Sequence, residues 1–335
     1  MPPSLPQMLI GLPATPLADA LAAALGGDGP ALGALHGRAA ANRRDRALTL
    51  LSIYDLHTAP LELLGETVRH QGDPAVADLK QRLEATWVAD LEQAWRDTPG
   101  LGGLPTADRA TPDEAVRALR AVAARDRLPA VYRWLAEQAS WPELLQFLAL
   151  EGGPDGGFDD LVAICQLGLA GSAKLALAKN YWDEMGNGQP DAVHTVLHQQ
   201  LVAALGLTHQ SREQQPLAAL ERSALSGLLA TNRRWQPEMI GALGLLELQA
   251  GPRCRLVLQA FDRLNAPAGA YPFYLEHAEV DPVHGLDWTE QAVAPLVAEH
   301  PGWGPRIVRG AWWRATVNLA FFQAAQQLTR TTEAA

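Results

Sequence analysis

Helical periodicity without a strand pattern constrains the fold of this chain more than any other feature. Apolar residues recur at helical spacing in segments such as 17–25, 42–56 and 75–95, and Gly- and Pro-rich joints separate these segments. No run of β-branched residues alternates with period two, and alanine and leucine dominate over valine and isoleucine. The sequence therefore predicts an all-α protein.

The composition favours a folded chain and excludes several classes of function. The 335 residues are 48% hydrophobic and 19% charged, which is enough for one large domain or two ordinary ones. A formal net charge of −10 argues against nucleic-acid binding, which needs a basic face. No apolar stretch approaches the ~20 residues that span a bilayer, and the start of the chain lacks the basic region of a secretion signal. The two cysteines, Cys165 and Cys254, are expected to be buried thiols in a reducing compartment. We therefore expect a cytoplasmic protein with no membrane or nucleic-acid partner.

A Gly- and Pro-rich stretch at residues 98–105 is the clearest linker, and Thr111-Pro-Asp-Glu114 then reopens a helix with proline in its first turn. We place a boundary after this linker. Residues 1–128 are expected to form a helical accessory or dimerisation region, and residues 129–335 to hold the chemistry.

The second part begins with a capping box at Ser140-Trp-Pro-Glu143. Further helices are expected around residues 160–185, 191–205, 237–250, 271–284 and 305–328.

One of these helices carries three residues of the kind that bind metals. His277, Asp281 and His284 are spaced i, i+4 and i+7, so their side chains fall within about 60° of one another on a helix. Two imidazoles and a carboxylate on one stripe suit iron, manganese or zinc.

Three glutamates and a histidine occupy positions where the helical period expects apolar residues. Glu151, Glu184, His194 and Glu247 each extend an apolar stripe on a separate segment. A buried carboxylate needs a cation, a proton or a hydrogen-bond network. A metal site inside a helix bundle explains all four positions with one cause.

Together these seven residues form a carboxylate-rich set without thiolates, which suits a dinuclear iron or manganese site. Two other classes of function stay open: a zinc or manganese hydrolase with the same ligands, and a non-catalytic helical scaffold or haem carrier. Haem needs only one axial histidine, so a haem carrier would leave the glutamates unexplained.

The segment between Glu184 and His194 contains Gly186, Gly188 and Pro190, so it is expected to break the helix. Glu184 would then end one helix and His194 would begin the next. Pro282 lies inside the 277–284 stripe and is expected to kink or loosen that helix.

Two neighbouring residues have less certain roles. His198, one turn after His194, could contact a ligand or simply be buried. Tyr274 shares the face of His277 and could line a substrate cavity, although packing is its simpler role.

The motif Asn180-Tyr-Trp-Asp-Glu184-Met-Gly-Asn-Gly188 followed by His194, together with His277-x3-Asp281-x2-His284, resembles the haem-oxygenase-like diiron oxidases and oxygenases. This family is often labelled iron-containing redox enzymes, and the resemblance covers roughly residues 130–330. The chain has no Glu-x-x-His, so it does not resemble the ferritin-like diiron proteins.

The resemblance implies a haem-oxygenase-like helical bundle that binds two irons instead of haem. It implies that Glu184 and His194 are ligands from the second core helix, and that the 277–284 stripe supplies the ligands of the third. Glu247 matches an additional carboxylate of the N-oxygenating branch. Glu151 matches the first-helix ligand, with Asp159 and Asp160 as alternatives. The region 1–128 is similar to a dimer-forming accessory part, which implies a homodimer.

The chemistry that the resemblance implies is oxidation by O2 through a peroxo-diferric species. We expect N-oxygenation of a small amine or amino-acid-derived substrate, with oxidative C–C cleavage, desaturation or decarboxylation as alternatives. An external electron donor is compatible with each of these. Arg306, Arg309 and Arg314 are candidates to bind a substrate carboxylate, and surface solubility is the competing role.

Overall fold

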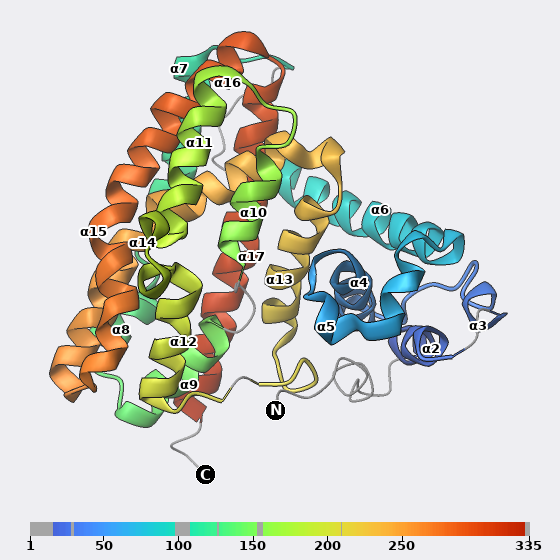
Figure 1. The fold of residues 1–335 in the computed structure, drawn as a ribbon, viewed down its shortest axis with the longest axis horizontal. Helices are drawn as coiled ribbons and strands as arrows, with labels where there is room; N and C mark the ends of the chain where they lie inside the picture. The colour runs from blue at the N-terminus through green and yellow to red at the C-terminus, as the bar shows by residue number, and fades with distance from the viewer. Residues whose placement is uncertain are drawn as a thin grey trace. The chain divides into compact units, whose positions relative to one another are not determined.

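A computed structural model of the chain describes residues 16–27, 30–97, 108–125, 127–152, 157–208 and 210–331. Regular secondary structure in these ranges is helical, without a strand, which confirms the predicted all-α class. The chain divides into two compact units: Met1–Thr98 with Gln210–Asn232, and Pro99–His209 with Arg233–Ala335 (Figure 1). The start of the chain and the predicted linker at 98–105 lie outside the described residues.

The first unit contains helices α2 (Pro16–Leu25), α3 (Pro30–Gly33), α4 (Arg43–Thr58), α5 (Leu61–Leu64), α6 (Pro74–Asp97) and α13 (Leu217–Ala230). The predicted segments 17–25, 42–56 and 75–95 correspond to α2, α4 and α6. Asn42 caps α4 by accepting a hydrogen bond from the Asp45 backbone N–H at 3.0 Å. Helix α13 packs against α4, although it lies far from α4 in sequence.

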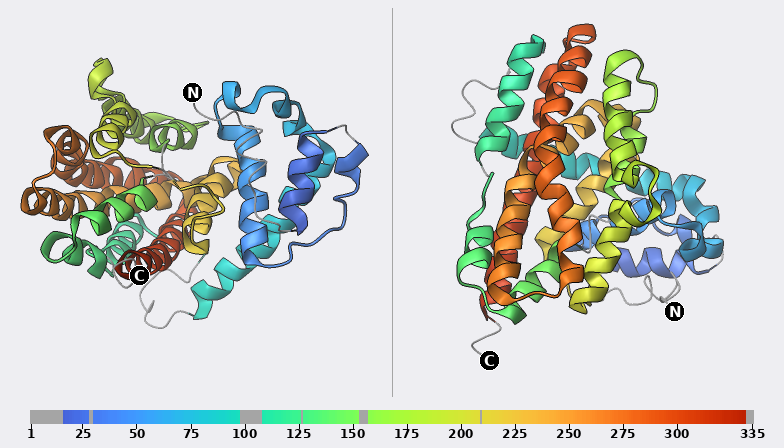
Figure 2. Two further views of the ribbon diagram at one scale, coloured as in Figure 1. Left: turned by 90° about the horizontal axis from the view of Figure 1, so that it is seen from below. Right: turned by 60° about the vertical axis from the view of Figure 1, so that its left-hand side comes forward.

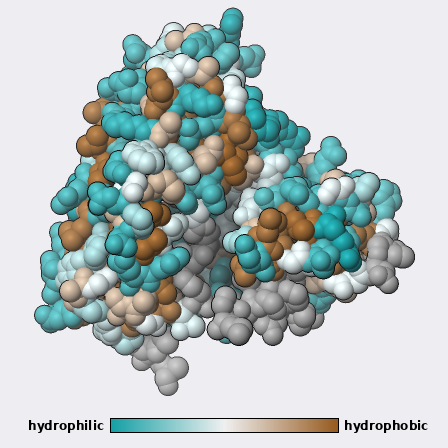
Figure 3. All heavy atoms as spheres, viewed as in Figure 1, coloured by the Kyte–Doolittle hydropathy of each residue, from teal (hydrophilic) through white to brown (hydrophobic). Residues whose placement is uncertain are grey.

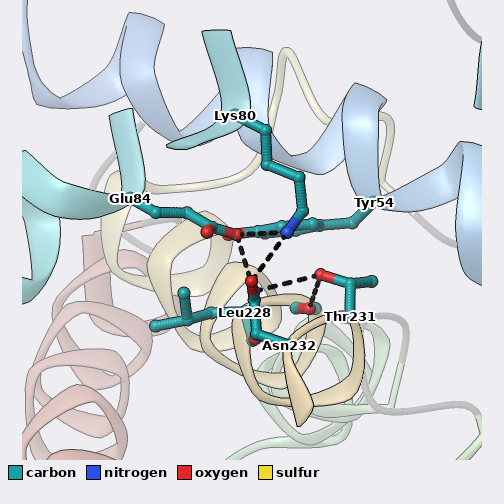
Figure 4. A network of polar contacts seen from close by, with 7 residues as sticks. Tyr54, Lys80, Glu84, Leu228, Thr231 and Asn232 are labelled. Atoms are coloured by element: carbon teal, nitrogen blue, oxygen red, sulfur yellow. Dashed lines mark hydrogen bonds and ion pairs between the residues drawn. The ribbon is translucent and has the colours of Figure 1, made fainter. Parts of the chain in front are cut away.

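A buried polar network ties three segments of the first unit together (Figure 4). The Glu84 carboxylate of α6 accepts hydrogen bonds from the Tyr54 hydroxyl at 3.1 Å and the Asn232 amide at 2.9 Å. Lys80 Nζ lies 2.9 Å from Glu84 Oε1 and donates to Asn232 Oδ1 at 3.1 Å. Each charge in this network therefore has an opposite charge or a hydrogen-bond partner.

The second unit contains the other helices, which run alongside one another (Figures 1 and 2). They are α7 (Pro112–Arg125), α8 (Ala130–Glu137), α9 (Trp141–Glu151), α10 (Phe158–Cys165), α11 (Gly171–Glu184), α12 (His194–Leu205), α14 (Gln236–Leu264), α15 (Tyr271–Asp287), α16 (Ala294–Glu299) and α17 (Trp303–Thr331). Helix α14 packs against both α15 and α17. The backbones of α14 and α17 approach so closely that a Cβ on Gly241 would clash with Ile307, and one on Gly310 would clash with Glu238.

The division into units differs from the boundary expected at residue 128. Helix α7 belongs to the second unit, because it buries Ala115, Leu119 and Val122 and packs against α14, α16 and α17. Residues 210–232 belong to the first unit, because α13 buries its apolar face against α4. Dimerisation through the first unit stays a prediction.

Several helix limits also differ from the expected ones. The segment expected at 160–185 is two helices, α10 and α11, separated by a turn at residues 166–170. Helix α14 runs past Pro252 to Leu264, and α15 runs past Pro282 to Asp287 before a π-helical turn at Trp288–Val293. The helix continues on both sides of Pro282, and the kink or loosening expected there stays a prediction. The capping box is confirmed, since the backbone N–H and the hydroxyl of Ser140 both donate to the Glu143 carboxylate.

The face of the molecule in Figure 3 carries hydrophobic residues scattered among hydrophilic ones in each unit. Among the described residues, no helix is both long enough and apolar enough to cross a membrane. Both cysteines are buried free thiols, as expected.

Candidate metal centre

Helices α11 and α12 follow one another along one side of the second unit, with a break between them (Figures 1 and 2). As predicted, α11 ends at Glu184 and α12 begins at His194. The chain turns at Gly186, where φ is +62° and a Cβ would lie 2.5 Å from the backbone carbon of Ala192. Only glycine fits there. The turn brings Glu184 Oε2 within 2.8 Å of His194 Nδ1, and both side chains are buried.

Two glycines let α15 approach α14 closely beside the candidate ligands. A Cβ on Gly285 would lie 3.2 Å from the carbonyl oxygen of Glu247, and one on Gly251 would lie 3.0 Å from the Pro282 ring. Side chains at these positions would push the helices apart. The close approach places Glu247 Oε2 3.5 Å from His284 Nδ1.

Glu184, Glu247 and His284 therefore converge from three helices. One ligand atom from each lies within 4.8 Å of the others, and all three residues are buried. Asp281, one turn before His284 on α15, is 3% exposed.

Several buried polar atoms around this cluster lack hydrogen-bond partners among the described residues. These are His194 Nδ1, His284 Nδ1, Asp281 Oδ2, Asp183 Oδ2 and Asn180 Oδ1. The two imidazole nitrogens have carboxylate oxygens at 2.8 and 3.5 Å, but not in hydrogen-bond geometry. Two ligand atoms at right angles on one cation, each ~2.1 Å away, would lie roughly 3 Å apart. The spacing therefore fits atoms that share a metal ion.

The raised pKa values of the buried groups in the cluster also indicate that it would bind a cation. Burial, followed by the neighbouring Glu247 and Glu184 carboxylates, raises the pKa of Asp281 well above its usual value. Burial acts to lower the pKa of His194 and His284, but Glu184 and Glu247 respectively outweigh it, so both pKa values are raised. A metal ion would take the place of these protons, and carboxylate and imidazole donors without thiolates suit iron.

The tautomer and the pKa of His277 both suit a neutral metal ligand. Its Nδ1 lies 2.7 Å from the carbonyl oxygen of Phe273, which can only accept, so Nδ1 carries the proton. Burial, followed by the nearby His194, lowers the pKa of His277 to about 4. The ring is therefore neutral near pH 7, with its lone pair on Nε2, and its centroid lies 4.7 Å from that of His194.

Glu151, like His277 and Asp281, is outside the two groups of converging ligand atoms, and its role as a ligand stays a prediction. Its two carboxylate oxygens accept hydrogen bonds from the hydroxyls of Tyr132 and Tyr274. Of the two alternatives, Asp160 is exposed. Asp159 is half-buried, and its Oδ1 lacks a hydrogen-bond partner among the described residues. Burial and Asp160 raise the pKa of Asp159, and His194 acts to lower it.

The structure adds residues that the sequence analysis did not select. Asp183 Oδ2 lies 2.9 Å from His284 Nε2, and the Asn180 amide donates to Glu247 Oε1 at 2.8 Å. Asp183, His194 and Glu276 also offer ligand atoms within 4.8 Å of one another. Asn180 precedes Glu184 by one helical turn, which was a signal for a shared face.

Two of the three arginines bind a protein carboxylate, and the substrate role of the third, Arg314, stays a prediction. Arg306 and Arg309 both bind the Glu238 carboxylate, which is fully buried, so their charges neutralise a protein carboxylate instead of facing a substrate. Arg314 is 1% exposed on α17, so surface solubility does not explain it.

His198 and Tyr274 are both outside the two groups of converging ligand atoms. His198 lies beside Gly152, which follows the last residue of α9. A Cβ on Gly152 would lie 2.5 Å from the Nε2 of His198. Tyr274 is buried against Glu151.

Comparison with known proteins agrees with this geometry. A family model described as iron-containing redox enzyme matches residues 145–318, which confirms the resemblance and the haem-oxygenase-like fold. A nitrosourea synthase from Streptomyces achromogenes subsp. streptozoticus is 26% identical over 248 residues, which are 72% of this chain and 48% of that protein. The chain thus spans about half the length of the curated relative it matches.

Proposed function

This chain belongs to the iron-containing redox enzymes, and on that premise we propose that it is a non-haem diiron enzyme. It would use O2 to oxidise a small amine or amino-acid-derived substrate. The observation that carries the proposal is the convergence of Glu184, Glu247 and His284 inside the second unit.

Six candidate ligands fit two irons better than one. They are Glu184, His194, Glu247, His277, Asp281 and His284. Six donors would fill the coordination positions of a single octahedral ion and leave no place for O2. Carboxylates can bridge two ions, so the same six donors shared between two irons leave positions open. Glu151 has a tyrosine hydroxyl on each oxygen and could still offer a second lone pair to an ion.

When bound, the ferrous pair would supply electrons for the activation of O2. The protein's own groups have separate tasks. Glu184, Glu247 and Asp281 offset the positive charge, and their burial keeps bulk water away. The hydrogen bond from His277 Nδ1 to Phe273 fixes the tautomer that leaves Nε2 able to bind.

N-oxygenation is the specific reaction that we propose. Its support is the additional carboxylate Glu247 and the similarity to a protein named nitrosourea synthase, because a nitrosourea carries an oxidised nitrogen. For a primary amine the balance is R–NH2 + O2 + 2 e⁻ + 2 H⁺ → R–NHOH + H2O. Two electrons per turnover must come from outside the substrate, so an external electron donor is part of the proposal.

Oxygen consumption tests this function. The protein is loaded with ferrous iron without air and mixed with O2, a chemical reductant and a panel of amines, amino acids and guanidines. We expect one substrate class to accelerate O2 uptake and to gain one oxygen atom on nitrogen, as measured by mass spectrometry with ¹⁸O2. Loss of a carbon fragment would favour C–C cleavage instead. Turnover without O2 uptake, with zinc or manganese bound, would contradict the proposal and indicate a hydrolase.

A matched pair of variants separates the site from general damage. Glu184→Ala should abolish the O2 uptake. Glu279→Ala, on the exposed side of α15, should leave it unchanged.

A further inference from the structure

We propose that Asn180 and Asp183 of α11 are positioning residues, which hold the outer atoms of Glu247 and His284 so that the inner atoms of these ligands face the same ion. This inference rests on the proposed function, since it concerns ligands of the proposed metal centre.

Asn180 fixes the orientation of Glu247. Its side chain is 6% exposed, and its Nδ2 donates to Glu247 Oε1 at 2.8 Å. A carboxylate only accepts hydrogen bonds, so the amide nitrogen must face Glu247 and the amide orientation is settled. With Oε1 held in this way, Glu247 Oε2 is the oxygen that lies near His284 Nδ1, at 3.5 Å.

Asp183 does the same for His284. Its Oδ2 lies 2.9 Å from His284 Nε2, on the side of the imidazole opposite to Glu247. The two atoms are close but outside hydrogen-bond geometry, since Asp183 Oδ2 has no hydrogen-bond partner among the described residues. The negative charge beside Nε2 favours the tautomer with the proton on Nε2, which leaves the lone pair on Nδ1 for a metal. The other oxygen of Asp183 accepts a hydrogen bond from Asn187, in the turn between α11 and α12. The turn that joins Glu184 to His194 therefore also steadies Asp183.

One helix thus organises ligands from two others. Asn180 lies one turn before Glu184, and Asp183 directly precedes it, so α11 presents a ligand and two positioning residues together. Without Asn180, Glu247 could turn Oε1 inward, and without Asp183 the His284 ring could exchange its proton between nitrogens. Either change loosens the ion held by Glu184, Glu247 and His284.

Anaerobic titration with Co(II) and Fe(II) tests the proposal on the full chain. Co(II) reports ligand geometry through its visible absorption, and each ion's affinity is measured by competition with a chelator. Asp183→Asn and Asn180→Ala should each weaken one of the two ions about 10–100-fold and change its Co(II) spectrum. The affinity of the other ion should fall less, because only the ligands that the two ions share couple the two affinities.

Asp287→Asn is the matched control. Asp287 is also a carboxylate near His284, on the same helix, but it binds Lys179 Nζ at 2.7 Å. Among the described residues, it has no hydrogen bond or ion pair with a candidate ligand. Its variant should keep wild-type affinity for both ions. Circular dichroism and thermal unfolding of the metal-free variants show whether each still folds, so a lost ion can be attributed to positioning.

The results distinguish a failure of the proposed metal centre from a failure of the positioning role. If Glu184→Ala keeps both ions, the proposed metal centre fails. If Glu184→Ala loses an ion while Asp183→Asn and Asn180→Ala bind and absorb like wild type, the centre stands and the positioning role is overturned.

Discussion

Each unit of this protein contains a buried polar cluster, and the two clusters differ in how their atoms are satisfied. In the first unit, the side-chain polar atoms of Tyr54, Lys80, Glu84 and Asn232 are bound to one another (Figure 4). In the second unit, carboxylates and imidazoles face one another at 2.8 and 3.5 Å outside hydrogen-bond geometry.

The difference shows what to expect from a buried polar group. A network with matched positive and negative groups is complete in the protein alone, and it joins helices. The candidate metal centre has three buried carboxylates, Glu184, Glu247 and Asp281. In the metal-free protein its positive charge comes from protons on His194 and His284, whose pKa values are raised. The first cluster should therefore contribute the same stability with or without iron, and the contribution of the second should depend on whether protons or iron occupy it.

The largest expected effect breaks the complete network. Glu84→Ala leaves Lys80 without its buried partner, and breaking such a pair costs about 3–5 kcal/mol of unfolding free energy. Urea unfolding, with and without iron, should show the same loss in both states. Glu62→Ala, at an exposed position of the same unit, should have almost no effect. A loss that appears only with iron would contradict the comparison.

The pH dependence of iron binding is the next largest effect. Because the pKa values of His194 and His284 are raised, iron must displace protons from them, and its affinity should rise about tenfold per pH unit for each displaced proton. In the metal-free protein, these two histidines stabilise the fold below their usual pKa of 6.5, and that contribution is lost as the pH rises through their raised values.

The contribution of His277 to the stability of the fold depends on pH in the opposite direction. Its pKa is lowered to about 4, so its contribution to stability is present above 6.5 and is lost as the pH falls toward 4. Because iron displaces protons from His194 and His284, whose pKa values are raised, the gain in melting temperature on adding iron should grow between pH 6 and pH 8, as measured by differential scanning calorimetry. A gain that shrinks over this range would mean that the histidines are not displaced by iron.

The smallest expected effect is a gain in stability of the metal-free protein when a carboxylate of the second cluster is removed. Asp281→Asn removes a carboxylate whose pKa is raised by burial and by Glu247, with little change in shape. The metal-free protein should become more stable by about 1 kcal/mol, or ~2–4 °C in melting temperature. The gain should increase with pH, because the native carboxyl ionises at higher pH. A loss of stability in the metal-free protein would show that Asp281 has a structural partner.

The sequence predicted the elements of the candidate centre better than their surroundings. Amphipathic periodicity located most helices, and the glycines after Glu184 predicted the break before His194. The ligand candidates could be found because the helical period shows which positions face the core, and a polar residue at such a position stands out in the local sequence.

Features that depend on distant contacts could not be predicted in this way. The partner of Arg306 and Arg309 is Glu238, on another helix, so sequence alone could not separate a substrate role from a structural one. The phenol partners of Glu151 come from α8 and α15. Asn180 and Asp183 lie within the recognised motif, but a polar residue near a helix end is usually solvated, and only the fold shows which ligands they hold.

Iron stoichiometry of the wild-type protein tests the central claim most directly. Metal-free protein is titrated with ferrous iron without air, and bound iron is counted by Mössbauer spectroscopy and elemental analysis while the melting temperature is followed. Completion of the buried cluster by metal predicts two irons per chain and a stabilisation of about 2.7 kcal/mol for each ion when free iron is a hundredfold above that ion's dissociation constant. Fewer than two irons, or full loading without a change in melting temperature, would contradict it.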